Sequence, residues 1–352
     1  MRLLVLPGDG IGPEIVASTV AVLDALDRRF GLAFSYTIRD IGFAALKTGG
    51  STLPDDILDL ARGMDGTLLG PISHLDYPPR DKGGINVSAA FRKELDLFAN
   101  VRPARTRAGV FHRGTEMDLV IMRENTEGMY PDRNMHAGTG EFMPTEDVAI
   151  SMRKVTAKAI ERIARASFEL ARVRRRKVTA VHKANAFVLT DGLFLKEVRK
   201  IAALYPDVEL EEVLIDAMAA LLVRDASRYD VICTTNFYGD TLSDLASELS
   251  GSLGLGGSLN AGTDHAAAQA QHGSAPDIAG QDKANPTSMI LSAAMLLRWH
   301  GERSGDVRYV EAATAIEQVI DRVLSDVSTS TGDLGGPLGT RQFTETVVAA
   351  LS

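Results

Sequence analysis

The chain has 352 residues, of which 45% are hydrophobic and 24% are charged, and its formal net charge is −8. This length exceeds the size at which one hydrophobic core usually stops growing, so we expect two domains or one domain interrupted by an insertion. The acidic balance argues against nucleic-acid binding. No apolar run approaches the ~18 residues of a membrane span, and the apolar stretch before Pro7 is too short for a signal peptide. We therefore expect a cytoplasmic protein that binds neither nucleic acid nor membrane.

Strand-like runs alternate with amphipathic runs along much of the chain. The patterns predict strands over residues 2–6, 33–38, 66–69, 119–122, 178–182 and 230–234. They predict helices over residues 13–27, 54–62, 153–172, 191–204 and 286–299, and Pro13, Pro54 and Pro286 suit the first turn of a helix. Residues 129–147 lack periodicity and are predicted to form an exposed arm or hairpin. The alternation indicates an α/β fold.

The single cysteine, Cys233, cannot form an intramolecular disulfide bond. It follows Val231 and Ile232, and this apolar context favours a thiol buried in a strand over a reactive one. A reducing compartment fits this cysteine usage.

A glycine-rich turn, Gly8-Asp9-Gly10-Ile11-Gly12, follows the first predicted strand. The Rossmann fingerprint is G-x-G-x-x-G, with an acidic residue about 20 positions further on. Here the spacing is G-x-G-x-G followed by proline, which argues against a Rossmann dinucleotide site. A tight turn from strand to helix is the simpler interpretation.

Two aspartates, Asp240 and Asp244, lie four residues apart in a segment of helical character, so both carboxylates project from one helix face. Like charges one turn apart repel, and the pair could simply be solvated. The functional alternative is a Mg²⁺ or Mn²⁺ site, because hard divalent cations prefer carboxylate oxygens. The spacing alone leaves both open.

Arg92 and Arg102 lie on either side of a transition from helix to strand in FRKELDLFANVRP, and Arg123 directly follows the strand predicted at 119–122. Guanidinium groups bind carboxylates through paired hydrogen bonds. A single arginine is most often a surface charge, so the three together only suggest a site for an anionic substrate.

Six segments occur in one order: GDGIGPE, FRKELDLFANVRP, RENTEGMY, HKAN, GDTLSDL and HGSAPDIAG. Together they resemble the β-decarboxylating dehydrogenase family, which includes isocitrate, homoisocitrate, isopropylmalate and tartrate/D-malate dehydrogenases. The resemblance implies an isopropylmalate dehydrogenase-like α/β fold, with two lobes on a twisted mixed sheet, and not a Rossmann fold. It implies a discontinuous cofactor-binding lobe of residues 1–98 plus 250–352. Residues 99–249 would form an inserted lobe with the arm and the interface of a homodimer.

The resemblance also assigns roles to residues of this chain. It implies that Arg92, Arg102 and Arg123 hold the malate carboxylates, that Tyr130, Lys183 and Asp216 are catalytic, and that Asp216, Asp240 and Asp244 bind Mg²⁺ or Mn²⁺. Lys183 and Asp216 would reach the site from the other subunit. The implied reaction removes hydride from C2 of a 2-hydroxy acid and then CO₂, and a divalent cation aids it by lowering the pKa of the C2 hydroxyl.

The cofactor implied by the resemblance is NAD. The expected contacts are Ile11, His272, Gly273, Ser274, Ala275, Asp277 and Asn285. A carboxylate at Asp277 can accept hydrogen bonds from ribose hydroxyls and would repel a 2′-phosphate. Members that use NADP tend to carry Lys-Tyr where this chain has Asp277 and Ile278.

Residues 85–90 form the window expected to contact the C3 substituent of the substrate. Asn86 and Ser88 favour a polar arm, as in isocitrate or homoisocitrate, over an isopropyl group. Because Ala89 and Ala90 are small and leave room, a promiscuous site is an alternative. Isopropylmalate and tartrate or D-malate, which other members of the family oxidise, are the alternative substrates. The sequence departs from the family at two positions near the expected binding site of the nicotinamide. Ile85 stands where isopropylmalate enzymes carry a glutamate, and Gln269 stands where most members carry an acidic residue.

A regulatory subunit without catalysis is the alternative from another class. Such subunits typically lose the lysine, the tyrosine or a metal-binding aspartate. This chain retains Tyr130, Lys183 and Asp216, together with the three arginines and the other two aspartates. The sequence therefore favours an active enzyme.

Overall fold

The computed structural model describes residues 1–351, which divide into two compact units. Unit 1 comprises Met1–Leu95, Arg107–Phe111 and Gly251–Ser352, and unit 2 comprises Asp96–Thr106 and His112–Ser250. Both units combine helices with strands, as the sequence predicts. The assignment of cofactor binding to residues 1–98 plus 250–352 and of dimerisation to residues 99–249 stays a prediction.

Unit 1 contains five neighbouring strands in the order β2-β1-β3-β12-β11. They are β1 (Arg2–Leu6), β2 (Ser35–Ile38), β3 (Gly66–Leu69), β11 (Leu259–Ala261) and β12 (Ala266–Gln269). All pairs are parallel except β11 with β12, so this part of the sheet is mixed. Every residue of β3 and β12 is buried, which is typical of strands covered on both faces.

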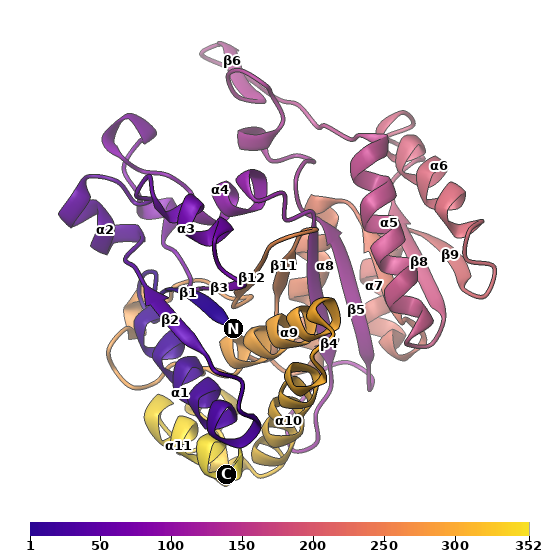
Figure 1. Cartoon of the computed structure of the whole chain (residues 1–352). Coiled ribbons are helices and arrows are strands. Elements are labelled where there is room, and N and C mark those ends of the chain that lie inside the picture. The colour runs from indigo at the N-terminus through magenta and orange to yellow at the C-terminus, as the bar shows by residue number, and fades with distance from the viewer. Residues whose placement is uncertain (352) are drawn as a thin grey trace. The chain divides into compact units, whose positions relative to one another are not determined.

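The helices of unit 1 come from both ends of the chain. They are α1 (Gly12–Phe30), α2 (Gly42–Gly49), α3 (Ile57–Arg62), α4 (Val87–Glu94), α9 (Thr287–Ser304), α10 (Val307–Leu324) and α11 (Thr340–Leu351). Figure 1 shows α1 in indigo beside α11 in yellow, and these two helices pack against each other. Apolar side chains on α1 such as Ile15 and Leu26, and Phe343 and Val347 on α11, are fully buried.

Unit 2 has the strand order β4-β5-β10-β8-β9, in which only β4 and β5 are antiparallel. Its strands are β4 (Ala99–Arg105), β5 (Asp118–Glu124), β8 (Lys177–His182), β9 (Glu209–Leu214) and β10 (Val231–Thr234). Its helices are α5 (Ala157–Arg172), α6 (Thr190–Ala202), α7 (Ile215–Asp225) and α8 (Asn236–Ser250).

Strand β10 shows how unit 2 builds two cores. Val231 and Cys233 belong to an apolar cluster with α5 and α6, whereas Ile232 belongs to a second cluster with α7 and α8. Successive side chains of a strand point to opposite faces, so helices cover both sides of this part of the sheet. Cys233 is fully buried, which confirms the predicted buried thiol, and this burial raises the pKa of the thiol to about 12.

The predicted arm contains a hairpin of β6 (Glu141–Thr145) and β7 (Val148–Ser151). Every residue of both strands is exposed, including the apolar side chains Phe142, Met143 and Ile150. The prediction of an exposed arm or hairpin is confirmed, and its apolar surface is unusual for a monomer.

Several predicted details are wrong. The helix expected at 54–62 begins only at Ile57, so Pro54 precedes it, and Pro286 caps α9 from outside its first turn. The helix expected from residue 153 begins at Ala157, because the hydroxyl of Thr156 caps the backbone N–H of Ala159. The Ala/Gln-rich run at 266–269 is a central strand that the pattern did not reveal.

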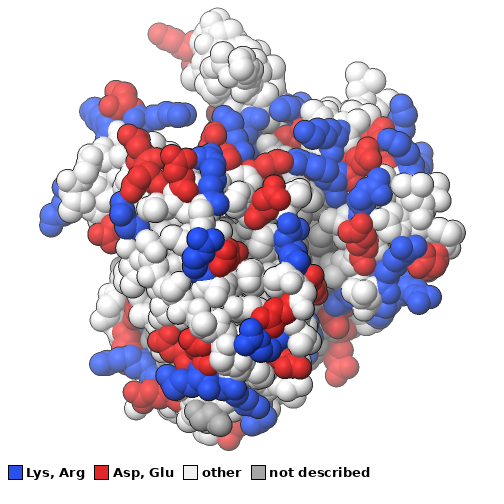
Figure 2. Space-filling view, in the orientation of Figure 1, with Lys and Arg blue, Asp and Glu red and all other residues white. Residues whose placement is uncertain are grey.

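Figure 2 shows basic and acidic side chains interspersed on the face that is drawn. Within residues 1–351, no helix combines the length and the apolarity needed to cross a bilayer.

Candidate active site

The glycine-rich turn after β1 packs directly against the segment 272–280. The backbone N–H of Ile11 donates to the carbonyl of Ser274 at 2.8 Å, and the hydroxyls of Ser73 and Ser274 lie 2.7 Å apart. Gly10 has a φ of +57°, and a Cβ at this position would lie 2.0 Å from the Ser274 oxygen. The glycines therefore permit close approach of two backbone segments.

The segment 272–280 presents Asp277 to solvent. Ala275, just ahead of it, has a φ of +37°, which is rare for a residue with a side chain. The Asp277 carboxylate is exposed and has no hydrogen-bond or ion-pair partner within residues 1–351. The His272 ring packs onto its own loop, with Nδ1 2.9 Å from the Gly273 carbonyl oxygen, and burial lowers its pKa.

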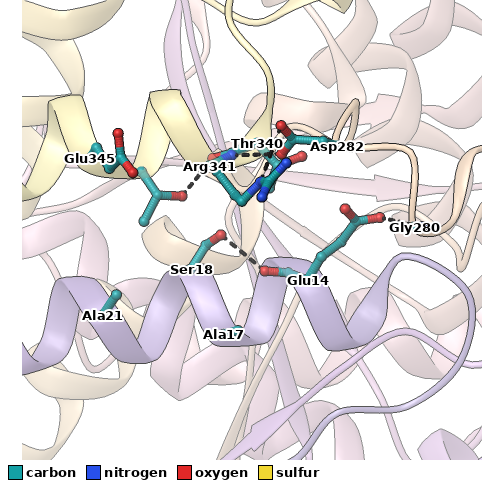
Figure 3. A pocket seen from close by; sticks show the side chains of 10 residues that line it. Glu14, Ala17, Ser18, Ala21, Gly280, Asp282, Thr340, Arg341 and Glu345 are labelled. Atoms are coloured by element: carbon teal, nitrogen blue, oxygen red, sulfur yellow. Dashed lines mark hydrogen bonds and ion pairs between the residues drawn. The ribbon is translucent and has the colours of Figure 1, made fainter.

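Two helices of unit 1 hold the end of this segment (Figure 3). A carboxylate oxygen of Glu14 on α1 accepts from the backbone N–H of Gly280 at 3.1 Å. The Asp282 carboxylate accepts from the backbone N–H of Arg341 at the start of α11, at 2.9 Å. A pocket of about 570 Å³ lies between α1 and α11 beside these contacts.

Asn285, an expected cofactor contact, also forms hydrogen bonds within the protein. It is buried, its side-chain oxygen accepts from the backbone N–H of Thr287, and its amide nitrogen donates to Asp333 at 3.1 Å. Asn285 thus joins the first turn of α9 to the loop that holds Asp333.

The specificity window lies at the start of α4. The side-chain oxygen of Asn86 accepts from the backbone N–H of Ala89 at 3.0 Å, so Asn86 caps the helix. The Ser88 hydroxyl accepts from the side-chain amide of Gln269 at 2.7 Å. Arg92 lies four residues beyond Ser88 on the same helix face. Of the two polar side chains in the window, Asn86 caps the helix, and only Ser88 is not used as a cap.

In unit 2, the Asp240 carboxylate collects three donors. Its Oδ1 accepts from Nη1 of Arg102 at 3.2 Å and from Nη1 of Arg123, and its Oδ2 accepts from the Tyr130 hydroxyl at 2.6 Å. The side chains of Arg102 and Arg123 are only 6% and 2% exposed, whereas that of Asp240 is 39% exposed. Burial and then the nearby charge of Arg123 lower the pKa of Arg102 to about 10.

Asp244 lies one turn further along α8. Its carboxylate is 3.4 Å from Nη1 of Arg102, and its side chain is 53% exposed. The predicted aspartate pair is therefore not simply solvated: Asp240 faces Arg102 on β4 and Arg123 on β5, and Asp244 faces Arg102.

Tyr130 is fixed by its ring and by its hydroxyl. The guanidinium carbons of Arg123 and Arg133 lie 5.6 Å and 5.0 Å from the ring centroid. The hydroxyl also accepts from Nη2 of Arg123 at 3.1 Å. Cation–π contacts and hydrogen bonds of this kind hold the phenol in one orientation.

Lys183 and Asp216 form a separate pair, in which the lysine Nζ lies 2.5 Å from Oδ1 of the carboxylate. The hydrogen bond from Lys183 keeps the pKa of Asp216 below its usual value. The backbone N–H of Lys183 donates to the fully buried Asp191, which pairs with Arg153 at 2.7 Å. A buried ion pair therefore anchors the segment that carries the lysine.

Comparisons with known proteins identify the family of this chain. A family model described as isocitrate/isopropylmalate dehydrogenase matches residues 2–347. The 3-isopropylmalate dehydrogenase of Archaeoglobus fulgidus is 41% identical over 99% of both chains. The isocitrate/homoisocitrate dehydrogenase of Thermus thermophilus is 40% identical over 99% of this chain and 98% of the relative. The crystal structure of isocitrate dehydrogenase from Methylococcus capsulatus matches with a TM-score of 0.88 and 40% identity over 99% of both chains.

The chain belongs to the isocitrate/isopropylmalate dehydrogenase family. It is therefore an enzyme, an oxidative decarboxylating dehydrogenase, with the mixed α/β fold of that family. Dehydrogenases of this family use NAD and a divalent metal ion. Since the relatives named for the two substrate types are 41% and 40% identical, overall identity does not decide the substrate.

Two carboxylates of this chain, those of Asp240 and Asp244, are suited to bind a divalent cation. Asp240 and Asp244 supply partly exposed carboxylates on one helix face. Within residues 1–351, no three His, Cys, Asp or Glu side chains are grouped to hold a metal, so Asp216 does not complete the set in the same chain.

The sequence patterns do not predict several residues that surround Asp240. Asn236 accepts from Nε of Arg123 and donates to the carbonyl of Glu127, both at 2.8 Å. Gly239 lets α8 approach β5, because a Cβ there would lie 2.6 Å from the Cβ of Arg123. Ser243 accepts from Arg102 at 2.7 Å. Asn236, Gly239 and Ser243 lie close to Asp240 in the sequence, which is the only sequence feature that points to them. Spacing alone does not predict which side chains they contact.

Glu127 is a buried carboxylate of the same motif as Arg123. It accepts from the backbone N–H and the hydroxyl of Thr156 at 2.6 Å and 2.9 Å. Burial nevertheless raises its pKa to about 7, and the neighbouring Glu124 acts in the same direction. Since this pKa exceeds that of an unfolded glutamate, folding favours the protonated form, and stability is lost as the pH rises towards 7.

We expect Glu127→Gln to remove this penalty, because the amide can still accept from the Thr156 backbone and can donate to its hydroxyl. Relative to wild type, the variant should gain thermal stability between pH 5 and pH 8, on the order of 2 °C in Tm. Thermal unfolding followed by circular dichroism measures this. Glu146→Gln, on the exposed arm, is the control. Equal pH dependence in wild type and Glu127→Gln would contradict the account.

Proposed function

We propose that the enzyme oxidises and decarboxylates a 3-substituted malate whose C3 arm carries a carboxylate, as in isocitrate or homoisocitrate. The observation that carries this proposal is the hydroxyl of Ser88 in the first turn of α4, one helical turn before Arg92. A hydroxyl next to a helix N-terminus favours an anion over a hydrocarbon arm. Leucine-like side chains, which an isopropyl group requires, are absent from residues 86–90.

Arg102 and Arg123, with Arg92, are proposed to bind the malate carboxylates. The guanidinium groups of Arg102 and Arg123 are buried and already oriented by Asp240, Ser243 and Asn236. Little side-chain entropy is therefore lost when they bind a carboxylate.

Asp240 and Asp244 are proposed to hold Mg²⁺ or Mn²⁺ together with Asp216 of the partner subunit. A cation held there would lower the pKa of the C2 hydroxyl, and bound NAD would supply the acceptor for the hydride of C2. This assignment is supported by the position of both carboxylates on one face of α8 and by their partial exposure.

Two side chains are proposed to move protons. The neutral amine form of Lys183 of the partner subunit receives the proton of the C2 hydroxyl at Nζ, and Asp216 of the partner subunit, to which that lysine donates a hydrogen bond, orients it. The Tyr130 hydroxyl supplies the proton that C3 needs after CO₂ leaves, because its O–H is held by Asp240 and Arg123 in a fixed orientation.

NAD is proposed to bind along 272–280 with its adenosine ribose near Asp277. The exposed carboxylate of Asp277 is available to ribose hydroxyls, and it would repel a 2′-phosphate. Ile11 and Ser274, which are hydrogen-bonded to each other through their backbones, are proposed to line this site, with His272, Gly273 and Ala275.

A homodimer is the proposed minimal active form. The apolar surface of the arm and the exposed side chains of Val188, Leu189 and Phe237 all belong to unit 2. A second copy of the chain would bury such surfaces and would deliver Lys183 and Asp216 of the partner subunit.

Steady-state kinetics with Mg²⁺ or Mn²⁺ test the substrate and the cofactor together. We expect kcat/KM to be highest for isocitrate or homoisocitrate with NAD, at least about tenfold above isopropylmalate, tartrate and D-malate. NADP should be at least about tenfold poorer than NAD, because of the charge of Asp277. Preference for isopropylmalate would refute the assignment of Ser88, and metal binding without turnover on any substrate would favour a regulatory subunit.

Mixing of inactive variants tests the shared sites. Lys183→Ala and Tyr130→Phe should each be impaired as homodimers. If lysine and tyrosine of one site come from different subunits, each mixed dimer has one intact site, and random mixing restores about one quarter of wild-type activity. Absence of recovery, with heterodimers verified by native mass spectrometry, would show that each site belongs to one chain.

A further inference from the structure

Gln269 is held in place at the end of the central strand β12. Gln269 is only 8% exposed. Its backbone N–H donates to the carbonyl of Ser258, and its carbonyl accepts from the Ser292 hydroxyl, both at 3.1 Å. The side chain therefore starts from a fixed backbone position in unit 1.

The side-chain amide of Gln269 contacts one hydrogen-bond acceptor and one hydrogen-bond donor. Its nitrogen donates to the Ser88 hydroxyl oxygen at 2.7 Å, and its oxygen lies 3.5 Å from the side-chain nitrogen of the buried Asn260. Asn260 lies on β11, adjacent to β12. Because the side-chain nitrogen of Asn260 is a donor next to the Gln269 oxygen, the Gln269 amide is oriented with its nitrogen towards Ser88.

This orientation fixes the role of the Ser88 hydroxyl. An amide nitrogen cannot accept a hydrogen bond, so the oxygen of Ser88 must accept, and its own hydrogen points elsewhere. Within residues 1–351 the hydroxyl has no second partner. Ser88 is half-buried in the first turn of α4, where the helix dipole also favours an anion.

We propose that Gln269 is a positioning residue for substrate selectivity, which turns the Ser88 hydroxyl into a donor towards the carboxylate of the C3 arm. The inference rests on the proposed function, since it presumes that Ser88 contacts this arm. A carboxylate at position 269 would do the opposite. It would accept the Ser88 hydrogen and add a negative charge near the arm.

Gln269→Met tests the positioning role without adding charge, because it keeps the length of the side chain and removes the donor. We expect kcat/KM for isocitrate or homoisocitrate to fall roughly fivefold to thirtyfold, and kcat/KM for isopropylmalate to change less than about twofold. Ser88→Ala should show the same selectivity loss, and Ser88→Thr, which keeps the hydroxyl, should retain most of the wild-type preference. In the Ser88→Ala background, Gln269→Met should have no further effect.

Gln269→Glu gives a second readout. Its loss of activity on the carboxylate-bearing substrate should be larger at pH 8 than at pH 6, because a protonated glutamate can donate to Ser88 as the amide does. Equal losses on isocitrate and isopropylmalate, or additive effects of Gln269→Met and Ser88→Ala, would overturn the inference. If wild type itself prefers isopropylmalate, the proposed function fails first, whatever the variants show.

Discussion

The carboxylate of Asp240 is the interaction on which the rest of the site depends. Arg102 and Arg123 place two positive charges on adjacent strands, with side chains that are almost completely buried. Buried charges of like sign are costly unless a counter-ion and hydrogen bonds compensate them. Asp240 supplies that compensation from the first half of α8 and at the same time orients the Tyr130 hydroxyl.

The local sequence is arranged around this contact. Gly239 gives α8 the room to approach β5, and Asn236 joins Arg123 to the backbone of Glu127. The same carboxylate that stabilises the arginines is exposed enough to face a cation in the proposed function. A bound cation would therefore compete with the arginines for Asp240 and free their donors for the substrate carboxylates. Stability and function share one side chain here.

How far the sequence predicts this protein differs between elements. The strands at 2–6 and 66–69 and the burial of Cys233 follow from apolar patterns and are present in the structure. The strand β12 is not predictable in this way, because alanine and glutamine have weak strand preference, and burial between β3 and β11 decides its conformation.

The site shows a similar division. The spacing of Asp240 and Asp244 correctly places them on one helix face, and the order of the motifs identifies the family. The helix cap formed by Asn86 has a sequence signal, since asparagine is a preferred residue ahead of a helix, whereas the motif comparison assigns Asn86 only a substrate contact. The contact of Gln269 with Ser88, 181 residues away, is a consequence of tertiary packing that local patterns do not contain.

The most direct test of the account compares the urea unfolding of Asp240→Asn and Asp244→Asn in the presence of a chelator, and their activities in separate assays with Mg²⁺. Both variants should lose metal-dependent activity if both aspartates bind the cation. Only Asp240→Asn should lose substantial stability, about 2 kcal/mol in urea unfolding, because it leaves two buried guanidinium groups without their shared counter-ion. Asp244→Asn, which alters a half-exposed pair, should cost less than about 0.5 kcal/mol. Equal stability of the two variants would contradict the central role of Asp240.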